Sequence, residues 1–199
     1  MLKLKSIMEL SEDECEKELT KHLKNNSKSK IEKTVAHSKR VLEICKKIVT
    51  YYDDDLEEEM KKLLYISAMF HDIAKFDDNK RHHEEAENVL KSMFQNDKQL
   101  KKDKQLEKDK QLEKVCRIIA CHKGKFNPKD NILIPAAILR ISDKIDKINK
   151  DKIDDFVDKY SSSMEKIKES FIKNGKDFEK FKEACDKVKI ETEKIKILR

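Results

Sequence analysis

Residues 132–141 read ILIPAAILRI and are apolar on nearly every side of a helix. Pro135 falls in the first turn of that helix, where its missing N–H removes no hydrogen bond. A helix that is apolar all round has to be buried inside the protein. We therefore expect this segment to form the central helix of the fold, and Asp143 continues the same helix.

Amphipathic segments lie on both sides of this stretch. Apolar residues recur at three-to-four spacing from about 31 to 52, from 56 to 74 and from 81 to 94, and again in two stretches after residue 150. The chain holds only two Gly and two Pro, whereas sheets joined by tight turns use more of both. Its 199 residues suffice for one hydrophobic core and are few for two. We predict a single all-α domain.

A six-residue repeat interrupts this pattern. DKQLKK, DKQLEK and DKQLEK occupy residues 97–102, 103–108 and 109–114. A step of six residues rotates by roughly 240° around a helix, so Leu100, Leu106 and Leu112 point in three directions and cannot form one buried stripe. The repeat, residues 97–114, is therefore predicted to be a solvated helical insertion without a catalytic role.

Composition narrows the partners and the compartment. Charged residues make up 43% of the chain, but acidic and basic types are interleaved and leave a net charge of +6. The basic residues are almost all Lys, whereas duplex recognition favours Arg and clustered charge, so duplex nucleic acid is not expected. Five Cys without a C-x-x-C pair fit a reducing compartment, and no segment approaches the roughly 20 apolar residues of a membrane span. We expect a soluble, cytoplasmic protein that is not membrane-bound, and its oligomeric state stays open.

Imidazole and carboxylate side chains gather in the middle of the chain, and a divalent transition metal uses such ligands. His71 and Asp72 are neighbours near a predicted helix end and can flank one ion from two sides. His37 falls on a buried helix face, and Asp143 on the central helix needs a partner because a lone buried carboxylate is costly. The alternatives are a helix-end histidine beside a solvated aspartate, a core His37 bonded to a backbone carbonyl, and an Asp143 that is the first exposed residue of its helix.

The order of these residues resembles the HD-domain metal-dependent phosphohydrolases. The resemblance spans roughly residues 30–150 and implies a compact HD-like helical bundle, to which residues 151–199 add peripheral packing helices. It rests on an upstream histidine followed by four strings, namely His37, AMFHDIAKF at 68–76, RHHEEAENVL at 81–90, CHKGK at 121–125 and AAILRISDKID at 136–146.

The resemblance also implies a ligand set. The four positions of a first metal ion are His37, His71, Asp72 and Asp143. Two-metal members of the family add histidines, which here selects His82 and His122, and Asp72 then bridges the two ions. His83 is expected to face solvent. The ion is divalent, and Mn, Fe, Co, Ni, Mg and Zn all stay open, as does the choice between one ion and two.

The implied activity is hydrolysis of a small phosphorylated substrate, a nucleotide phosphoester or phosphoanhydride, by a metal-bound water. If His82 and His122 are not ligands, they are expected to contact phosphate or transfer protons, and Lys75 is a third catalytic candidate. The cations expected to neutralise substrate phosphate are Lys75, Lys123, Arg140 and Lys144. Two alternatives are a catalytically silent HD module that binds metal and nucleotide in signalling, and a helical interaction protein.

Overall fold

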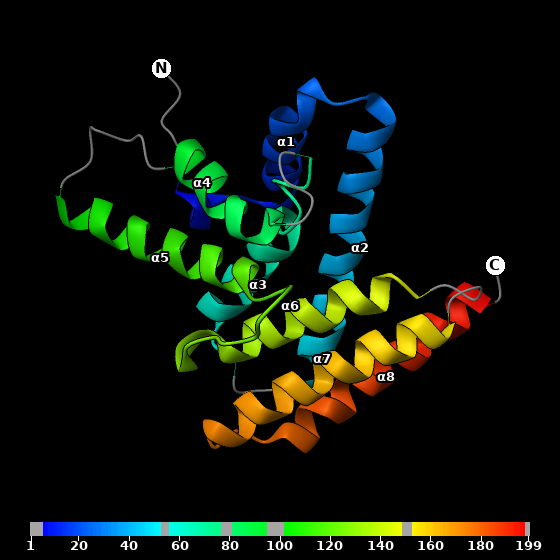
Figure 1. Cartoon of the computed structure of the whole chain (residues 1–199). Coiled ribbons are helices and arrows are strands. Elements are labelled where there is room, and N and C mark those ends of the chain that lie inside the picture. The colour runs from blue at the N-terminus through cyan, green and yellow to red at the C-terminus, as the bar shows by residue number, and fades with distance from the viewer. Residues whose placement is uncertain (1–5, 53–55, 77–80, 95–101, 149–152, 198–199) are drawn as a thin grey trace.

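The computed structural model of the chain describes residues 6–52, 56–76, 81–94, 102–148 and 153–197 (Figure 1). Every regular element within these ranges is helical, which confirms the predicted all-α class. Short 3-10 turns lie at Ile7–Glu9, Leu23–Asn25 and Asp130–Ile132. The α-helices are α1 (Glu12–His22), α2 (Lys28–Tyr52), α3 (Glu58–Phe70), α4 (His82–Phe94), α5 (Lys102–Ala120), α6 (Leu133–Asp146), α7 (Ile153–Lys173) and α8 (Phe178–Ile197).

The central helix is α6, as its sequence predicts. All of its residues except Ile134 and Lys144 are buried, and it contacts α2, α3, α5, α7 and α8. Pro135 is the third residue of the helix, where no intrahelical hydrogen bond is lost. Because α6 is covered on nearly all sides, Asp143 and Asp146 near its C-terminal end lie inside the protein.

Helices α2 to α5 lie on one side of α6, and α7 and α8 lie on the other (Figure 1). The long helix α2 packs on α3, α6 and α8. Helix α5 packs on α3 and α6, and α4 packs on α5. The C-terminal helices α7 and α8 lie along one another beneath the rest of the bundle, where Phe171 and Phe181 are fully buried. Helices α2 to α6 therefore meet in the interior, and α7 and α8 close one side.

Helix α3 ends earlier than periodicity alone predicts. The sequence predicts a helix as far as residue 74, but α3 ends at Phe70 and hydrogen-bonded turns follow through residue 76. In these turns Ile73 donates to the carbonyl of Phe70, and Lys75 donates to that of Asp72. These tight turns replace a further turn of α-helix, because their amides bond three residues back rather than four.

The repeat departs from its prediction in its last third. Residues 97–101 lie outside the described part of the chain, and the remainder of the repeat belongs to α5. Leu106 is exposed as expected, but Leu112 is 2% exposed and joins the core. The prediction of a solvated insertion is therefore wrong for residue 112, because α5 continues without a break from the repeat into the buried segment that follows it.

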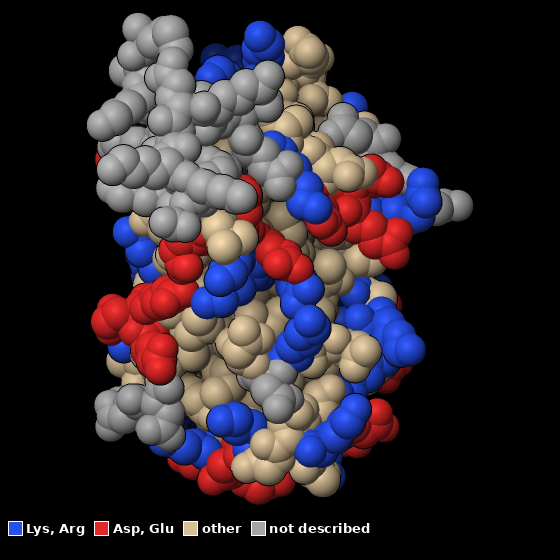
Figure 2. Space-filling model, turned by 90° about the vertical axis from the view of Figure 1, so that its left-hand side faces the viewer, with Lys and Arg blue, Asp and Glu red and all other residues tan. Residues whose placement is uncertain are grey.

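The surface carries both signs of charge. Figure 2 shows Lys and Arg side chains interspersed with Asp and Glu on one face, in line with the interleaved sequence. No described helix combines the length and apolar character needed to cross a bilayer. All five cysteines are buried and none forms a disulfide.

Candidate metal centre

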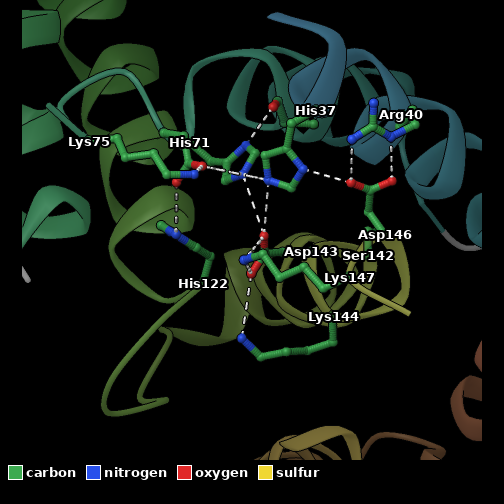
Figure 3. A network of polar contacts seen from close by, with 12 residues as sticks. His37, Arg40, His71, Lys75, His122, Ser142, Asp143, Lys144, Asp146 and Lys147 are labelled. Atoms are coloured by element: carbon green, nitrogen blue, oxygen red, sulfur yellow. Dashed lines mark hydrogen bonds and ion pairs between the residues drawn. The ribbon is translucent and has the colours of Figure 1, made fainter. Parts of the chain in front are cut away.

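His37 projects from α2 into the interior, and a hydrogen bond to Nδ1 fixes the orientation of its ring (Figure 3). Its Nδ1 lies 2.7 Å from Oδ2 of Asp146, and Arg40, one turn further along α2, donates to both oxygens of the same carboxylate at 2.7 and 3.0 Å. Burial raises the pKa of Asp146, but the hydrogen bonds from His37 and Arg40 outweigh it and lower that pKa to about 2. An ionised carboxylate only accepts, so Nδ1 carries the proton and Nε2 presents its lone pair.

His71, at the end of α3, and His122, at the end of α5, are oriented by the same kind of hydrogen bond. The Nδ1 of His71 donates to the carbonyl of Ala68 at 2.8 Å, and that of His122 donates to the carbonyl of Ile119 at 2.6 Å. Each carbonyl belongs to the last turn of a helix, where the regular intrahelical bonds run out, and that of Ile119 also accepts from the backbone amide of His122 at 3.1 Å. Both rings therefore direct Nε2 lone pairs away from their own helices and into the bundle.

Four ligand-type atoms from three segments converge where α2, α6 and the turn after α3 meet (Figure 3). The two Nε2 atoms of His37 and His71 lie 3.2 Å apart. From His37 Nε2 the distance is 3.6 Å to Oδ2 of Asp72 and 3.3 Å to Oδ1 of Asp143. From His71 Nε2 the corresponding distances are 3.8 and 3.7 Å.

These separations suit a single ion. With bonds of about 2.1 Å, neighbouring ligands are about 3.0 Å apart around an octahedral ion and about 3.4 Å apart around a tetrahedral one. The nitrogens of His37 and His71 face one another although each Nδ1 already carries its proton. When both rings are neutral, as metal binding requires, the two opposed lone pairs repel, and a cation placed between them removes that repulsion.

A second group of atoms shares Asp72 with the first. The Nε2 of His82 lies 3.0 Å from Oδ1 of Asp72, and the Nε2 of His122 lies 4.0 Å from the same oxygen. The three residues offer ligand atoms within 4.8 Å of one another, and all three are buried. Asp72 thus turns Oδ2 to the first group and Oδ1 to the second.

The two carboxylates at the centre are ionised despite their burial. Burial acts to raise the pKa of Asp72, but its electrostatic interaction with His71 and the nearby His82 ring and Lys75 ammonium outweigh burial and lower that pKa. Burial likewise opposes ionisation of Asp143, whose pKa His37, His71 and Lys147 hold well below its usual range. Two negative charges therefore lie inside the protein, a costly arrangement unless cations compensate it.

Several polar atoms of the centre lack hydrogen bonds, which tests whether a metal fits. Nε2 of His122 is buried and has no hydrogen-bond partner. The buried Oδ1 atoms of Asp72 and Asp143 also lack a hydrogen bond, and their nearest nitrogens are His82 Nε2 at 3.0 Å and Lys147 Nζ at 2.5 Å respectively. Buried polar atoms are normally paired, so such a group in a native protein calls for an explanation. These atoms are acceptors or lone-pair donors. Oδ1 of Asp143 belongs to the first group, and Oδ1 of Asp72 and Nε2 of His122 belong to the second, so a cation in each group would satisfy them. The donor set of nitrogen and oxygen atoms fits a divalent ion.

Burial lowers the pKa of His122 well below its usual value, and the neighbouring His71 adds to this effect. His122 is therefore neutral at pH 7, the state in which an imidazole binds a metal. The pKa of His37 changes in the opposite direction. Burial lowers it, but Asp143 and Asp146 outweigh burial and raise it.

The predicted phosphate-binding cations fall into two kinds. Lys75 lies 2.6 Å from Asp72, Lys144 lies 3.4 Å from Asp143, and Lys123 follows His122 on the turn after α5. Arg140 differs, because it is buried and donates to the carbonyls of Cys121 and Gly124 at 2.9 and 3.1 Å. The prediction that Arg140 contacts phosphate stays a prediction. Its guanidinium holds the turn that carries His122 and Lys123.

His83 also departs from its prediction. It was expected to face solvent, but its side chain is only 13% exposed and its ring centroid lies 6.0 Å from that of His122. Burial lowers the pKa of His83, so this ring is neutral as well. His82 is fully buried and reaches Asp72, which separates the roles of the two adjacent histidines.

The sequence interpretation missed three residues that contact the centre. Asp146 was noted only as a neighbour of Asp143, and neither Arg40 nor Lys147 was a candidate. The ammonium of Lys147 lies 2.5 and 2.7 Å from the two oxygens of Asp143. A usable signal exists in the spacing, because Arg40 follows His37 by three residues just as Asp146 follows Asp143, and residues three apart share a helix face.

Comparison with protein-family models agrees with this geometry. The model of the HD domain matches residues 34–148, which contain both groups of converging atoms. The match covers more than half of the chain, and the chain therefore belongs to the HD-domain family. No curated protein and no solved structure gives a significant match.

Proposed function

We propose that the protein is a metal-dependent phosphohydrolase that cleaves a nucleotide phosphoester or phosphoanhydride. Membership of the HD-domain family supports the class, and the buried, unpartnered Nε2 of His122 beside the buried carboxylates of Asp72 and Asp143 supports a metal. The observation that carries the proposal is the 3.2 Å approach of the Nε2 atoms of His37 and His71 while both Nδ1 atoms carry protons.

The proposed ligands divide into two overlapping sets. Asp72 belongs to both sets because its two oxygens face in the two directions. When bound, a divalent ion supplies an activated water and offsets charge on phosphoryl oxygens. The first set is His37, His71, Asp72 and Asp143, and the second set is Asp72, His82 and His122.

The chain's own residues would perform the remaining tasks. Asp146 fixes the protonated edge of His37, and the carbonyls of Ala68 and Ile119 do the same for His71 and His122. Fixed tautomers present lone pairs without reorganisation, which strengthens metal binding. Lysine ammonium groups beside the carboxylates would then receive substrate phosphate.

The test begins with the protein purified without a chelating tag. Elemental analysis should give one or two divalent ions per chain, and a panel of nucleotide phosphoesters and phosphoanhydrides should be assayed with Mn²⁺, Fe²⁺, Co²⁺, Ni²⁺, Mg²⁺ and Zn²⁺. Asp72→Asn should lose all bound metal and activity, whereas His122→Ala should lose only the second ion. Asp155→Asn, an exposed carboxylate on α7, is the matched control and should change neither quantity.

Each outcome decides between functions. Unchanged metal content in folded Asp72→Asn would overturn the ligand set. A metal-bound protein that cleaves no member of the panel would instead support a metal- and nucleotide-binding module. Circular dichroism of each variant checks that the helical fold persists.

A further inference from the structure

Three lysine ammonium groups form ion pairs with the two carboxylates at the centre of the site (Figure 3). Lys75 lies 2.6 Å from Oδ2 of Asp72. Lys147 lies 2.5 Å from Oδ1 of Asp143, and Lys144 lies 3.4 Å from Oδ2 of that residue. Lys75 belongs to the turns after α3 and the other two to the end of α6, so the cations approach from different elements.

A fourth lysine lies among these groups without a carboxylate of its own. Lys123 is half-buried on the turn after α5, and it forms no ion pair with a residue in the described ranges. It interacts electrostatically with both carboxylates and also with Lys75 and Lys147, which repel it. A partly buried cation with cationic neighbours lacks compensation, and an anion at this place would supply it.

The carboxylate oxygens that form ion pairs with Lys75 and Lys147 are also the oxygens that lie nearest to His37. Oδ2 of Asp72 contacts Lys75 and lies 3.6 Å from His37 Nε2, and Oδ1 of Asp143 contacts Lys147 and lies 3.3 Å from the same nitrogen. An ion bound to these oxygens takes over the neutralisation that the ammonium groups now provide. The lysines are then left as uncompensated positive charge around the site.

The balance of charge in the loaded site is strongly positive. Two carboxylates and four ammonium groups leave a surplus of two positive charges, and each divalent ion adds two more. Asp146 does not reduce this surplus because Arg40 already neutralises it. A phosphate monoester carries at most about two negative charges at pH 7, so it leaves much of the surplus uncompensated. Each added phosphate of a chain brings further negative charge.

We infer that the substrate carries a chain of three or more phosphates, and that Lys123 binds a phosphate beyond the one that is cleaved. This inference rests on the proposed function, because bound metal enlarges the surplus and replaces the ammonium groups at the carboxylates. Lys144 and Lys147 lie at the end of α6, and Lys123 lies on the turn after α5. Lys144 and Lys147 contact Asp143 directly, and Lys123 directly follows the proposed ligand His122 and interacts electrostatically with Asp143, Asp72 and Lys147.

The test compares anions of increasing length on the metal-loaded protein. Calorimetry measures the affinity for orthophosphate and for the methylene-bridged analogues of diphosphate and triphosphate, which resist hydrolysis. Free metal is buffered, and elemental analysis after each titration checks that the ligand has not removed the ion. The triphosphate analogue should bind at least about tenfold more tightly than orthophosphate, since each charge-assisted contact contributes about tenfold or more.

Variants assign that gain to a residue. Lys123→Gln should lose most of the preference for the triphosphate analogue while its affinity for orthophosphate stays the same, and Lys123→Arg should restore part of it. Lys125→Gln is the matched control, because Lys125 is exposed on the same turn. Circular dichroism and unchanged metal content show that each variant keeps the centre intact.

The possible failures are distinguishable. Equal affinity for all three anions in a metal-loaded protein would overturn the inference and leave the hydrolase proposal standing. An equal loss in Lys123→Gln and Lys125→Gln would show general surface attraction and would also overturn it. A protein without metal would overturn the proposed function itself.

Discussion

His37 presents only Nε2 to the site because its other ring nitrogen donates to Asp146. The carboxylate of Asp146 is held in turn by two hydrogen bonds from Arg40, so three side chains form one continuous chain of contacts. Carboxylates behind a metal-binding imidazole orient the ring and increase its basicity. We therefore expect Arg40 and Asp146 to act on the metal through His37 without touching it.

Replacing Asp146 should weaken metal binding without abolishing it. Asp146→Ala removes the acceptor of His37 Nδ1 and leaves the guanidinium of Arg40 without its carboxylate, so metal affinity should fall by about 10–100-fold. Competition with a chromogenic chelator measures the affinity, and Asp155→Ala, an exposed aspartate on α7, serves as the control. Equal affinities in Asp146→Ala and wild type would show that the contact does not orient the ring.

The same carboxylate should contribute to the acid sensitivity of the metal-free protein. The pKa of Asp146 is lowered to about 2 in the fold, below the ordinary value of 3.8. A lowered pKa means that the stabilisation is complete above the ordinary value and is lost as the pH falls towards about 2. Urea unfolding should show wild type more stable than Asp146→Asn at pH 5, with the difference shrinking by pH 3. A difference independent of pH would contradict this account.

The sequence allows His37, His71, Asp72 and Asp143 to be selected, and the structure brings all four together. Their role as metal ligands stays a prediction. The adjacent pair His71 and Asp72 is recognisable because it follows a helical segment directly. Asp146 could not be separated from an ordinary surface aspartate, because its role depends on the position of α2 beside α6, which no local pattern contains.

The last turns of α3 and α5 orient His71 and His122 through hydrogen bonds. Hydrophobic periodicity does not predict these bonds. Apolar spacing locates α3 and α5 because it reflects the buried face of each helix. The ends are set by the bonds from His71 to the carbonyl of Ala68 and from His122 to that of Ile119. A predicted boundary at residue 74 was wrong for α3 because such side-chain bonds leave no trace in a hydrophobic pattern.

The turn after α5 depends on Gly124, which has a φ of 63°. A Cβ at this residue would lie 3.3 Å from Nε2 of His83, whereas a Cβ at Gly175, with a φ of 62°, would meet nothing within 4 Å. Alanine at either position should cost about 1–2 kcal/mol of stability because of the left-handed backbone. Only Gly124→Ala should also weaken binding of the second ion, since it disturbs the turn behind His122. Chemical unfolding and elemental analysis measure the two effects, and a similar loss of metal in Gly175→Ala would refute the distinction.

Helix α5 changes from solvated repeat to core within one continuous helix. Leu106 is 56% exposed and Leu112 is 2% exposed, although both occupy the same place in the repeated sequence. Leu112→Ala should therefore reduce the free energy of unfolding by about 2–5 kcal/mol, whereas Leu106→Ala should change it by about 0.5 kcal/mol or less. Urea denaturation of both variants provides the measurement. Equal effects would mean that the end of the repeat does not pack as described.

The arrangement of the whole chain explains why the centre lies where it does. The proposed ligands come from α2, from the turns after α3 and α5, from the start of α4 and from α6, whereas α7 and α8 provide none. The scarcity of Gly and Pro is enough to predict an all-helical chain. It does not determine which helices become neighbours, because each amphipathic face can in principle pack on several others.

A metal at this centre should stabilise the folded state, because its proposed ligands come from several separate helices. Anything that binds the folded state alone stabilises it, by about 2.7 kcal/mol when the free ion is 100-fold above its Kd. For a chain of this length that corresponds to a rise in Tm of about 5–10 °C. Thermal unfolding before and after exhaustive treatment with a chelator measures the rise, and Asp72→Asn should show none.

Hydrogen exchange of the backbone amides shows which helices the bound metal stabilises. Amides at the ends of α3 and α5 should gain protection when metal is added, because the proposed ligands His71, Asp72 and His122 lie there. Amides of α7 and α8 near Phe171 and Phe181 should change little, since those helices bury their own apolar contacts and hold no proposed ligand. A rise in Tm that persists in Asp72→Asn, or protection spread evenly over α7 and α8, would place the bound metal elsewhere on the protein.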